Sequence, residues 1–97
     1  MARVELTVDA ERDLVEIYLH GLEHFGYAST ERYVDALHAK MALAAEHPSF
    51  GANYEFVKSD LRRYECVSHA FYYRETIDGI LVLRILHGRM DPSRHLN

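Results

Sequence analysis

The spacing of apolar residues changes near the middle of the chain, and this change limits the fold to one that combines helices with a sheet. From residue 10 to residue 44, apolar side chains recur at steps of three and four, the period of a helix with one buried face. After His47-Pro48 they occur instead in short runs rich in aromatic and β-branched side chains, which is typical of strands. The sequence therefore predicts an α+β protein.

The predicted elements follow one another with short connections. Each boundary is set by a local signal: a capping side chain, a glycine, or a residue before proline. Because the link between the helices is short, they are expected to form an antiparallel hairpin. The predicted segments are a strand over residues 2–8, a helix from the N-cap Asp9 to Gly26, a second helix from Ser29 or Thr30 to His47, a loop over residues 48–58, strands over residues 61–66, 67–74 and 80–86, and a polar tail over residues 88–97.

Each helix carries one apolar face that is predicted to be buried. The spacing of these faces is the one required of a helix that packs on one side. They consist of Ala10, Leu14, Ile17, Tyr18, Leu22 and Phe25 in the first helix, and of Tyr33, Leu37, Met41 and Ala44 in the second.

The dipeptide Asp78-Gly79 predicts how the last two strands are joined. It favours a two-residue type I′ turn, which needs positive φ at both positions. The three strands after the helices would then form an antiparallel meander. Together with the N-terminal strand, this predicts an α+β fold with both helices on one face of the sheet and the other face open to solvent or to a partner.

Length and cysteine content limit the class of protein. A chain of 97 residues is bounded to one domain, residues 1–97. The chain has a single cysteine, Cys66, which is predicted to be a small buried residue. Because one cysteine cannot form an internal disulfide, the sequence excludes a disulfide framework and is consistent with a reducing cytosol. No signal peptide is evident, and apolar runs such as Ile80 to Leu83 are far short of the roughly 20 residues that a membrane helix needs. We therefore expect a cytoplasmic protein with no membrane partner.

Charge is distributed unevenly along the chain. Residues 1–57 carry ten acidic and four basic side chains, whereas residues 58–97 carry five acidic and seven basic ones. This asymmetry predicts an acidic and a basic functional face, although solvated acids on exposed helix faces would give the same count.

The sequence predicts no metal and no cofactor. His20 and His24 are four residues apart on the first helix, a spacing that can hold a metal ion, but no third ligand is evident. A solvated helix face is the preferred interpretation. The sequence contains no Gly-rich phosphate loop, nucleophile elbow or Cys–His zinc pattern.

Several local patterns occur in the order and at the separation found in one protein family. They are Ala10, Asp13-Leu14 and Ile17-Tyr18; Gly26 with Tyr33; Leu43-Ala44, His47-Pro48 and Gly51; Ser68 to Arg74; and Arg84 to Asp91 followed by His95-Leu96. The last two segments resemble the G-S-H-x-x-F-Y-R strand and the R-V-L-H-x-R-M-D…H-L ending of the ParE branch of the RelE/ParE toxin superfamily. The resemblance covers nearly the whole chain and implies a RelE/ParE-like fold.

The resemblance implies the toxin of a type II toxin–antitoxin pair, carried on a chromosome or on a plasmid that it stabilises. ParE toxins bind DNA gyrase, stabilise cleaved DNA and halt replication, so no enzymatic activity is expected of the chain itself. The implied partner is a ParD-like antitoxin with a ribbon-helix-helix part and a C-terminal segment that wraps the toxin. The complex represses its own operon, and operator DNA is contacted only through the antitoxin.

Two alternatives stay open beside the gyrase inhibitor: a RelE-type ribosome-dependent mRNA endoribonuclease, and a toxin fold retained only for complex formation or repression. Cleavage at a ribose 2′-OH needs a base and cations that hold the pentavalent phosphate. The resemblance places Ala70 where an arginine that grips phosphate is expected, and the chain ends in His95-Leu96-Asn97 without a terminal tyrosine. These departures favour a binding toxin over a nuclease.

Basic and aromatic residues in the sheet half form the predicted surface for the antitoxin or the target. They are Arg63, Tyr72, Arg74, Arg84, His87, Arg89 and His95. The alternative for the two strand arginines, Arg74 and Arg84, is structural. They would then pair with nearby carboxylates, namely those of Glu75, Asp78 or Asp91.

Two histidines are predicted to be structural rather than catalytic. His69 alternates with Phe71 and Tyr73 on its strand and is expected to be hydrogen-bonded. His87 would form an orienting pair with Asp91 that fixes the tail against the sheet.

Neighbouring tyrosines predict a binding surface. Tyr72 and Tyr73 point to opposite faces of their strand, so at least one faces away from the helices. Tyrosine is favoured at interfaces because it buries area while keeping a hydroxyl for hydrogen bonding. We expect the antitoxin segment to cover apolar surface between the helical hairpin and the sheet, since an exposed apolar groove is otherwise an aggregation risk.

Overall fold

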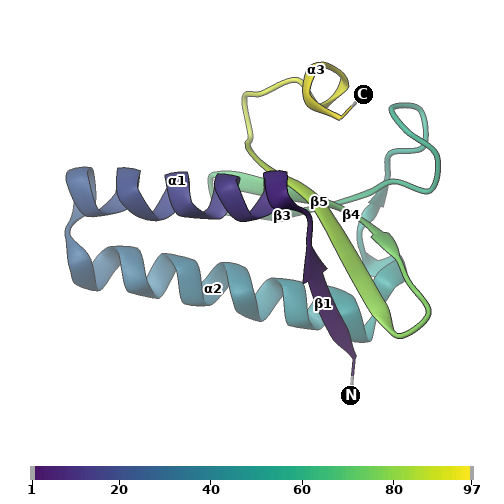
Figure 1. Ribbon diagram of the computed structural model, residues 1–97, viewed down its shortest axis with the longest axis horizontal. Helices are drawn as coiled ribbons and strands as arrows, with labels where there is room; N and C mark the ends of the chain where they lie inside the picture. Colours follow the sequence, from purple (N-terminus) through teal and green to yellow (C-terminus); the bar gives the residue numbers. More distant parts are fainter. Residues whose placement is uncertain (1, 97) are drawn as a thin grey trace.

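The computed structural model describes residues 2–96 and has the predicted α+β architecture. In chain order its elements are β1 (Arg3–Leu6), α1 (Val8–Phe25), α2 (Tyr27–Glu46), the 3-10 helix η1 (Pro48–Phe50), β2 (Ala52–Asn53), β3 (Arg62–Cys66), β4 (His69–Glu75), β5 (Gly79–His87) and α3 (Pro92–His95). Figure 1 shows α1 and α2 as a hairpin whose closed end projects away from the sheet. The predicted order of N-terminal strand, helical hairpin and antiparallel meander is confirmed.

The sheet has five strands in the order β1-β5-β4-β3-β2. β1 pairs in parallel with β5, and the other neighbours pair antiparallel. The meander β3-β4-β5 is the predicted one, whereas the two-residue strand β2 lies within the predicted loop over residues 48–58. The first strand of the chain therefore lies at a sheet edge, beside the last strand.

Helix α1 begins earlier than predicted because Thr7, and not Asp9, caps it. The Thr7 hydroxyl accepts a hydrogen bond from the N–H of Ala10 at 3.1 Å and donates one to the carbonyl of Leu83 at 2.7 Å. The capping residue thus also ties the start of α1 to β5. Asp9 lies within the first turn, where its charge still favours the positive end of the helix.

A single residue, Gly26, joins the two helices, so α2 begins at Tyr27 rather than at Ser29 or Thr30. Gly26 has a φ of 83°, a left-handed value that glycine adopts without steric cost. Thr30 lies in the first turn of α2, and its hydroxyl donates to the carbonyl of Gly26 at 2.7 Å. Thr30 also packs against Gly21, where a Cβ atom would lie 2.6 Å from the threonine hydroxyl oxygen. The two helices therefore approach closely at the closed end of the hairpin.

The connection between β4 and β5 is not the predicted type I′ turn. β4 ends at Glu75 and β5 begins at Gly79, and neither Asp78 nor Gly79 is among the described residues with positive φ. Gly79 is needed for another reason: a Cβ atom there would overlap the backbone carbonyl oxygen of Arg3 in β1. A tertiary contact, which the local pattern does not encode, selects this glycine.

Two apolar clusters lie on opposite faces of the sheet, because successive residues of β4 alternate between them. Phe71 and Tyr73 belong to the cluster beneath the helices, and Tyr72 belongs to the cluster on the other face. The far face is therefore partly covered rather than open. Its cluster consists of Leu61, Ala70, Tyr72, Leu86 and Leu96, with Tyr54, Val57 and Leu83 packed against it.

Three further predictions are corrected by the packing. The segment predicted as a polar tail contains α3, and its Leu96 is only 5% exposed because it joins the far-face cluster. Val67, predicted to begin a strand, lies in the turn before β4. Leu22 and Phe25 are predicted to lie on the buried face of the first helix but are 36% and 69% exposed. Leu22 lies on the outward side of α1 together with Val15, seven positions before it. Phe25 is the last residue of α1, at the closed end of the hairpin, which projects away from the sheet.

Candidate functional site

A groove of about 690 Å³ lies between the helical hairpin and the sheet, and we call it the hairpin–sheet groove. One wall is formed by α1 and the start of α2, and the other by the β3–β4 turn, the end of β5 and the segment that follows it. Its principal lining residues are Asp13, Ile17, His20, Phe25, Tyr33, Val67, His69, Arg84, His87 and Met90.

Exposed apolar side chains surround this groove. Phe25 is 69% exposed, Val67 is 85% exposed and Met90 is 37% exposed. Val67 also has a φ of 56°, which is unusual for a β-branched residue and costs about 1–3 kcal/mol. Apolar side chains that surround a concavity in this way are typical of a surface that a partner covers.

Asp13 and Arg84 form a bidentate pair beside the groove. The Arg84 Nε and Nη2 atoms donate to the two carboxylate oxygens of Asp13 at 2.8 and 2.9 Å, and the N–H of Ile85 donates to the same carboxylate at 2.9 Å. The hydrogen bond to Asp13 raises the pKa of Arg84, and this effect outweighs burial, which lowers it. The structural interpretation of Arg84 is confirmed in kind, but its partner is Asp13 and not Glu75, Asp78 or Asp91.

His69 is hydrogen-bonded, as predicted. Its Nδ1 lies 2.6 Å from the hydroxyl of Tyr33, which also donates to the carbonyl of Cys66 at 3.1 Å. Burial, together with the nearby His87 ring, lowers the pKa of His69 below its ordinary value of 6.5. The imidazole is therefore neutral at physiological pH and joins α2 to the turn between β3 and β4.

Arg63 and Tyr72 lie on the far face of the sheet, away from the groove. The Arg63 Nε donates to the Tyr72 hydroxyl at 3.0 Å, and its guanidinium lies 5.6 Å from the ring centre of Tyr54. Burial alone would lower the pKa of Arg63, but the hydrogen bonds to Glu65 and Tyr72 leave it raised. Tyr72 is 2% exposed, so it packs within the far-face cluster rather than offering a free binding surface.

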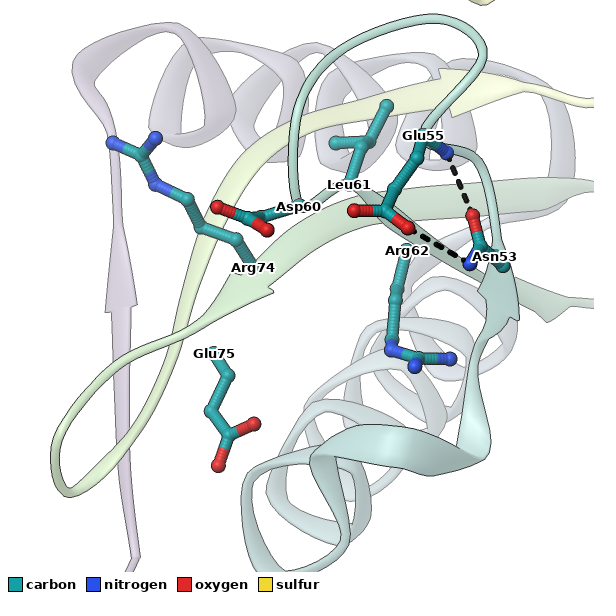
Figure 2. Close-up of a pocket in the computed structure, with 7 residues that line it drawn as sticks. All are labelled: Asn53, Glu55, Asp60, Leu61, Arg62, Arg74 and Glu75. Carbon is teal, nitrogen blue, oxygen red and sulfur yellow. Dashed lines mark hydrogen bonds between the residues drawn. The ribbon is translucent and has the colours of Figure 1, made fainter.

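Arg74 lies in a second, more polar pocket of about 440 Å³, which is lined by β2, the loop between β2 and β3, the start of β3 and the end of β4. In the view of Figure 2, its guanidinium and the side chain of Asp60 lie on one side of this pocket, and Glu55, hydrogen-bonded to Asn53, lies on the other. The mixture of acids and bases favours no single sign of ligand charge. Arg74 is exposed and does not share a surface with Arg84.

The remaining predicted residues belong to β5 and the segment after it. His87 lines the groove, and its Nδ1 accepts from the N–H of Arg89 at 3.3 Å. The predicted His87–Asp91 pair is absent from the described hydrogen bonds, because Asp91 instead caps α3 and accepts from Ser93. These bonds lower the pKa of the exposed Asp91 carboxyl. His95 contributes its backbone carbonyl, which accepts from Arg84 at 3.1 Å.

Of the seven predicted site residues, the structure therefore brings Arg84 and His87 into one groove, with the backbone of His95 bonded to Arg84. It joins Arg63 to Tyr72 on the far face and leaves Arg74 in the second pocket. The groove also contains Asp13, Phe25, Val67 and Met90, which were not selected as binding residues. The sequence predicts Asp13 as part of a family pattern and Phe25 as a core residue. Phe25, Val67 and Met90 share one signal, which is position: they lie at the end of α1, in the β3–β4 turn and after β5, where packing partners run out.

The described residues provide the basis for neither a metal site nor a membrane-spanning helix, as follows from their arrangement and composition. In residues 2–96, no cluster of three or more His, Cys, Asp and Glu side chains is arranged to hold a metal ion. His20 and His24 stack with their ring centres 4.0 Å apart on the exposed side of α1. Within the same residues, no helix has the length and apolar character needed to cross a membrane.

Comparison with known proteins places the chain in a family. Residues 4–92 match the family model described as "ParE toxin of type II toxin-antitoxin system, parDE". The chain is 31% identical over 96 residues to Toxin ParE1 of Mycobacterium tuberculosis, with 98% of each chain covered. It is 29% identical over 96 residues to Toxin ParE1 of Caulobacter vibrioides, with 99% of each covered.

A solved structure has the same fold. The chain matches one described as "Chromosomal ParDE TA system from P. aeruginosa" with a TM-score of 0.74 and 21% identity, covering 90% of this chain and 96% of that one. The α+β fold and the apolar groove beside its hairpin define a small protein of the toxin type found in such systems. The chain belongs to the ParE toxin family of type II toxin–antitoxin systems.

Proposed function

We propose that this protein acts in the cytoplasm as a toxin that inhibits DNA gyrase by binding, and that a ParD-like antitoxin with a ribbon-helix-helix domain neutralises it. Membership of the ParE family supports the target and the partner. Operator DNA would be contacted through the antitoxin alone. On this proposal the toxin supplies shape and charge to a complex with gyrase and catalyses no reaction itself.

The observation that carries the antitoxin part of this proposal is the hairpin–sheet groove. It has a volume of 690 Å³ and is surrounded by Phe25, Val67 and Met90, whose side chains are exposed in the isolated chain. An apolar segment of the antitoxin would remove these side chains from water, which contributes about 25 cal/mol for each Å² buried. The position of the groove agrees with the surface predicted from the sequence.

The pairing of the basic residues favours a binding toxin over a ribonuclease. Arg84 is held by the Asp13 carboxylate, and Arg63 is held by Tyr72 and Glu65. An arginine whose charge is already compensated holds a pentavalent phosphate less strongly, because the phosphate must compete with the carboxylate. The Arg63 and Arg84 side chains are thus committed to contacts within the fold.

The decisive experiment is a gyrase supercoiling and DNA-cleavage assay with toxin refolded free of its antitoxin. We expect supercoiling to stop, cleaved DNA to accumulate, and added antitoxin to reverse both effects. If gyrase is unaffected while induced expression still kills cells, the target is wrong and ribosome-dependent mRNA cleavage becomes the leading alternative. If expression is harmless, the fold has been retained only for complex formation or repression.

The groove assignment is tested separately by comparing the free toxin with its complex. The proposal expects the free toxin to be less soluble and less stable, since its groove is uncovered. Equal solubility and equal thermal midpoints of the two would contradict it.

A further inference from the structure

A second apolar surface lies on α1, on the side that faces away from the core. It consists of Val8, Val15, Leu19 and Leu22, which we call the outer stripe, and these side chains are 65%, 57%, 57% and 36% exposed. Residues seven apart on a helix differ by only about 20° in direction, and steps of three or four stay on the same side. The four side chains therefore form one continuous stripe along the helix.

The outer stripe is separate from both the core and the hairpin–sheet groove. The core side of α1 is marked by Ala10, which is fully buried, and by Ile17, which packs against the same cluster. The groove side is marked by Asp13 and His20. None of the outer-stripe residues lines the groove or belongs to either apolar cluster of the described chain. The stripe thus adds an unpartnered apolar face to a helix that is already packed on its other side.

A row of acidic residues runs beside the outer stripe. Asp9, Glu16 and Glu23 are also seven residues apart, are exposed, and each directly follows a stripe residue. They therefore form a parallel line of negative charge beside the stripe, on the side of the groove, and Glu16 also lines the groove. Arg12 is the one cationic Lys or Arg side chain of α1, and its Nη1 lies 3.9 Å from the carboxylate of Asp9, toward the acidic row.

This charge pattern disfavours a second copy of the chain as the occupant. In paired helices, the positions beside the apolar seam face one another and set the choice of partner. An antiparallel self-pair would bring Asp9, Glu16 and Glu23 against themselves, and a parallel self-pair would bring them near Glu11. Like charges so placed oppose association, whereas cations on the partner would favour it.

We propose that the outer stripe of α1 binds an amphipathic helix of a partner protein whose apolar seam is flanked by Lys or Arg. The apolar side chains of the partner helix lie between Val15, Leu19 and Leu22. A bound amphipathic helix ordinarily supplies such apolar side chains at intervals of three, four and seven residues. Its cations lie along the acidic row. This inference rests on the surface of α1 and does not depend on the occupant of the groove or on gyrase being the target.

The test uses purified free toxin and two synthetic helical peptides with the same leucine seam, one flanked by Lys and the other by Glu. Fluorescence anisotropy should show that the Lys-flanked peptide binds and that the Glu-flanked peptide binds at least about tenfold more weakly. The Val15→Ser/Leu19→Ser double variant should reduce binding of the Lys-flanked peptide by at least about tenfold. Both positions are more than half exposed, so the fold should be unchanged.

Two further variants separate this inference from the groove assignment. Met90→Ser alters the groove and should leave binding of the Lys-flanked peptide unchanged. Asp9→Lys/Glu23→Lys reverses the two charges of the acidic row that do not line the groove, and it should transfer the preference to the Glu-flanked peptide. Equal binding of both peptides, or undiminished binding by Val15→Ser/Leu19→Ser, would overturn the proposal. So would a toxin dimer in sedimentation that the same double variant abolishes, since it would make a second copy the occupant.

Discussion

Among single residues, Asp13 combines three contacts that join distant parts of the chain. Its carboxylate accepts two hydrogen bonds from Arg84 and one from the backbone of Ile85, so it connects α1 to β5. The Asp13 side chain is 11% exposed and that of Arg84 is 21% exposed, so solvent screens this pair only partly. Removing one member leaves the other poorly solvated and without its partner.

Replacing Asp13 by Asn should therefore lower the free energy of unfolding by about 2–4 kcal/mol. Urea denaturation of the variant measures this loss as a lower midpoint at unchanged slope. Asp9→Asn is the matched control, because it removes an equal charge from an exposed position of the same helix and should cost less than about 1 kcal/mol. Similar midpoints for the two variants would show that the pair with Arg84 contributes little.

His69 should make the stability depend on pH. Its pKa is lower in the folded protein than its ordinary value of 6.5, so below that pH the unfolded chain binds more protons. The stabilising contribution of the neutral imidazole is therefore fully present above pH 6.5 and is lost as the pH falls through the folded-state pKa. We expect His69→Gln to show a smaller drop in stability between pH 7.5 and pH 5.5 than the unmodified protein, as measured by urea denaturation at both values. An unchanged drop would assign the pH dependence to other groups.

At the scale of elements, the long periodic segments were predictable and the short ones were not. The helical faces around Leu37 and Met41, and the aromatic run through Phe71, lie in buried parts of the elements that their spacing predicts. β2 has two residues and exists because it pairs with β3, which no local spacing reveals. The candidate site could not be predicted for the same reason: it depends on contacts between distant parts of the chain, such as the pairing of Arg84 with Asp13 across 71 positions of sequence.

Gly79 allows an element-scale prediction about β1. A Cβ atom at this position would overlap the Arg3 carbonyl, so Gly79→Ala must push β1 away from β5. Hydrogen exchange should then show loss of protection at Arg3, whose N–H donates to the carbonyl of Asp78, and along the rest of β1, which pairs with β5, with the meander still protected. Gly26→Ala is a useful comparison, because nothing lies within 4 Å of its added Cβ and only the left-handed φ is penalised, by about 1 kcal/mol. Full protection of β1 in Gly79→Ala would contradict this account.

At the scale of the whole molecule, the groove is a place where stability and binding oppose each other. Val67 is 85% exposed and has positive φ, so it weakens the isolated fold while offering an apolar side chain to a partner. We expect Val67→Gly to raise the free energy of unfolding by about 1 kcal/mol or leave it unchanged, and to weaken antitoxin binding. Thermal denaturation and calorimetric titration measure the two effects. A variant that is less stable, or that binds equally well, would show that Val67 is held for another reason.

The parallel pairing of β1 with β5 also affects the order of events during protein synthesis. β1 precedes the other four strands in the chain and pairs with β5, so its backbone groups have no sheet partner until β5 has been translated. The helical hairpin, whose contacts are local, can form earlier, whereas the sheet beneath it cannot be completed. The hairpin–sheet groove, which needs both α1 and β5, therefore forms only after β5 has been translated. A nascent fragment that lacks β5 has neither this groove nor a finished sheet.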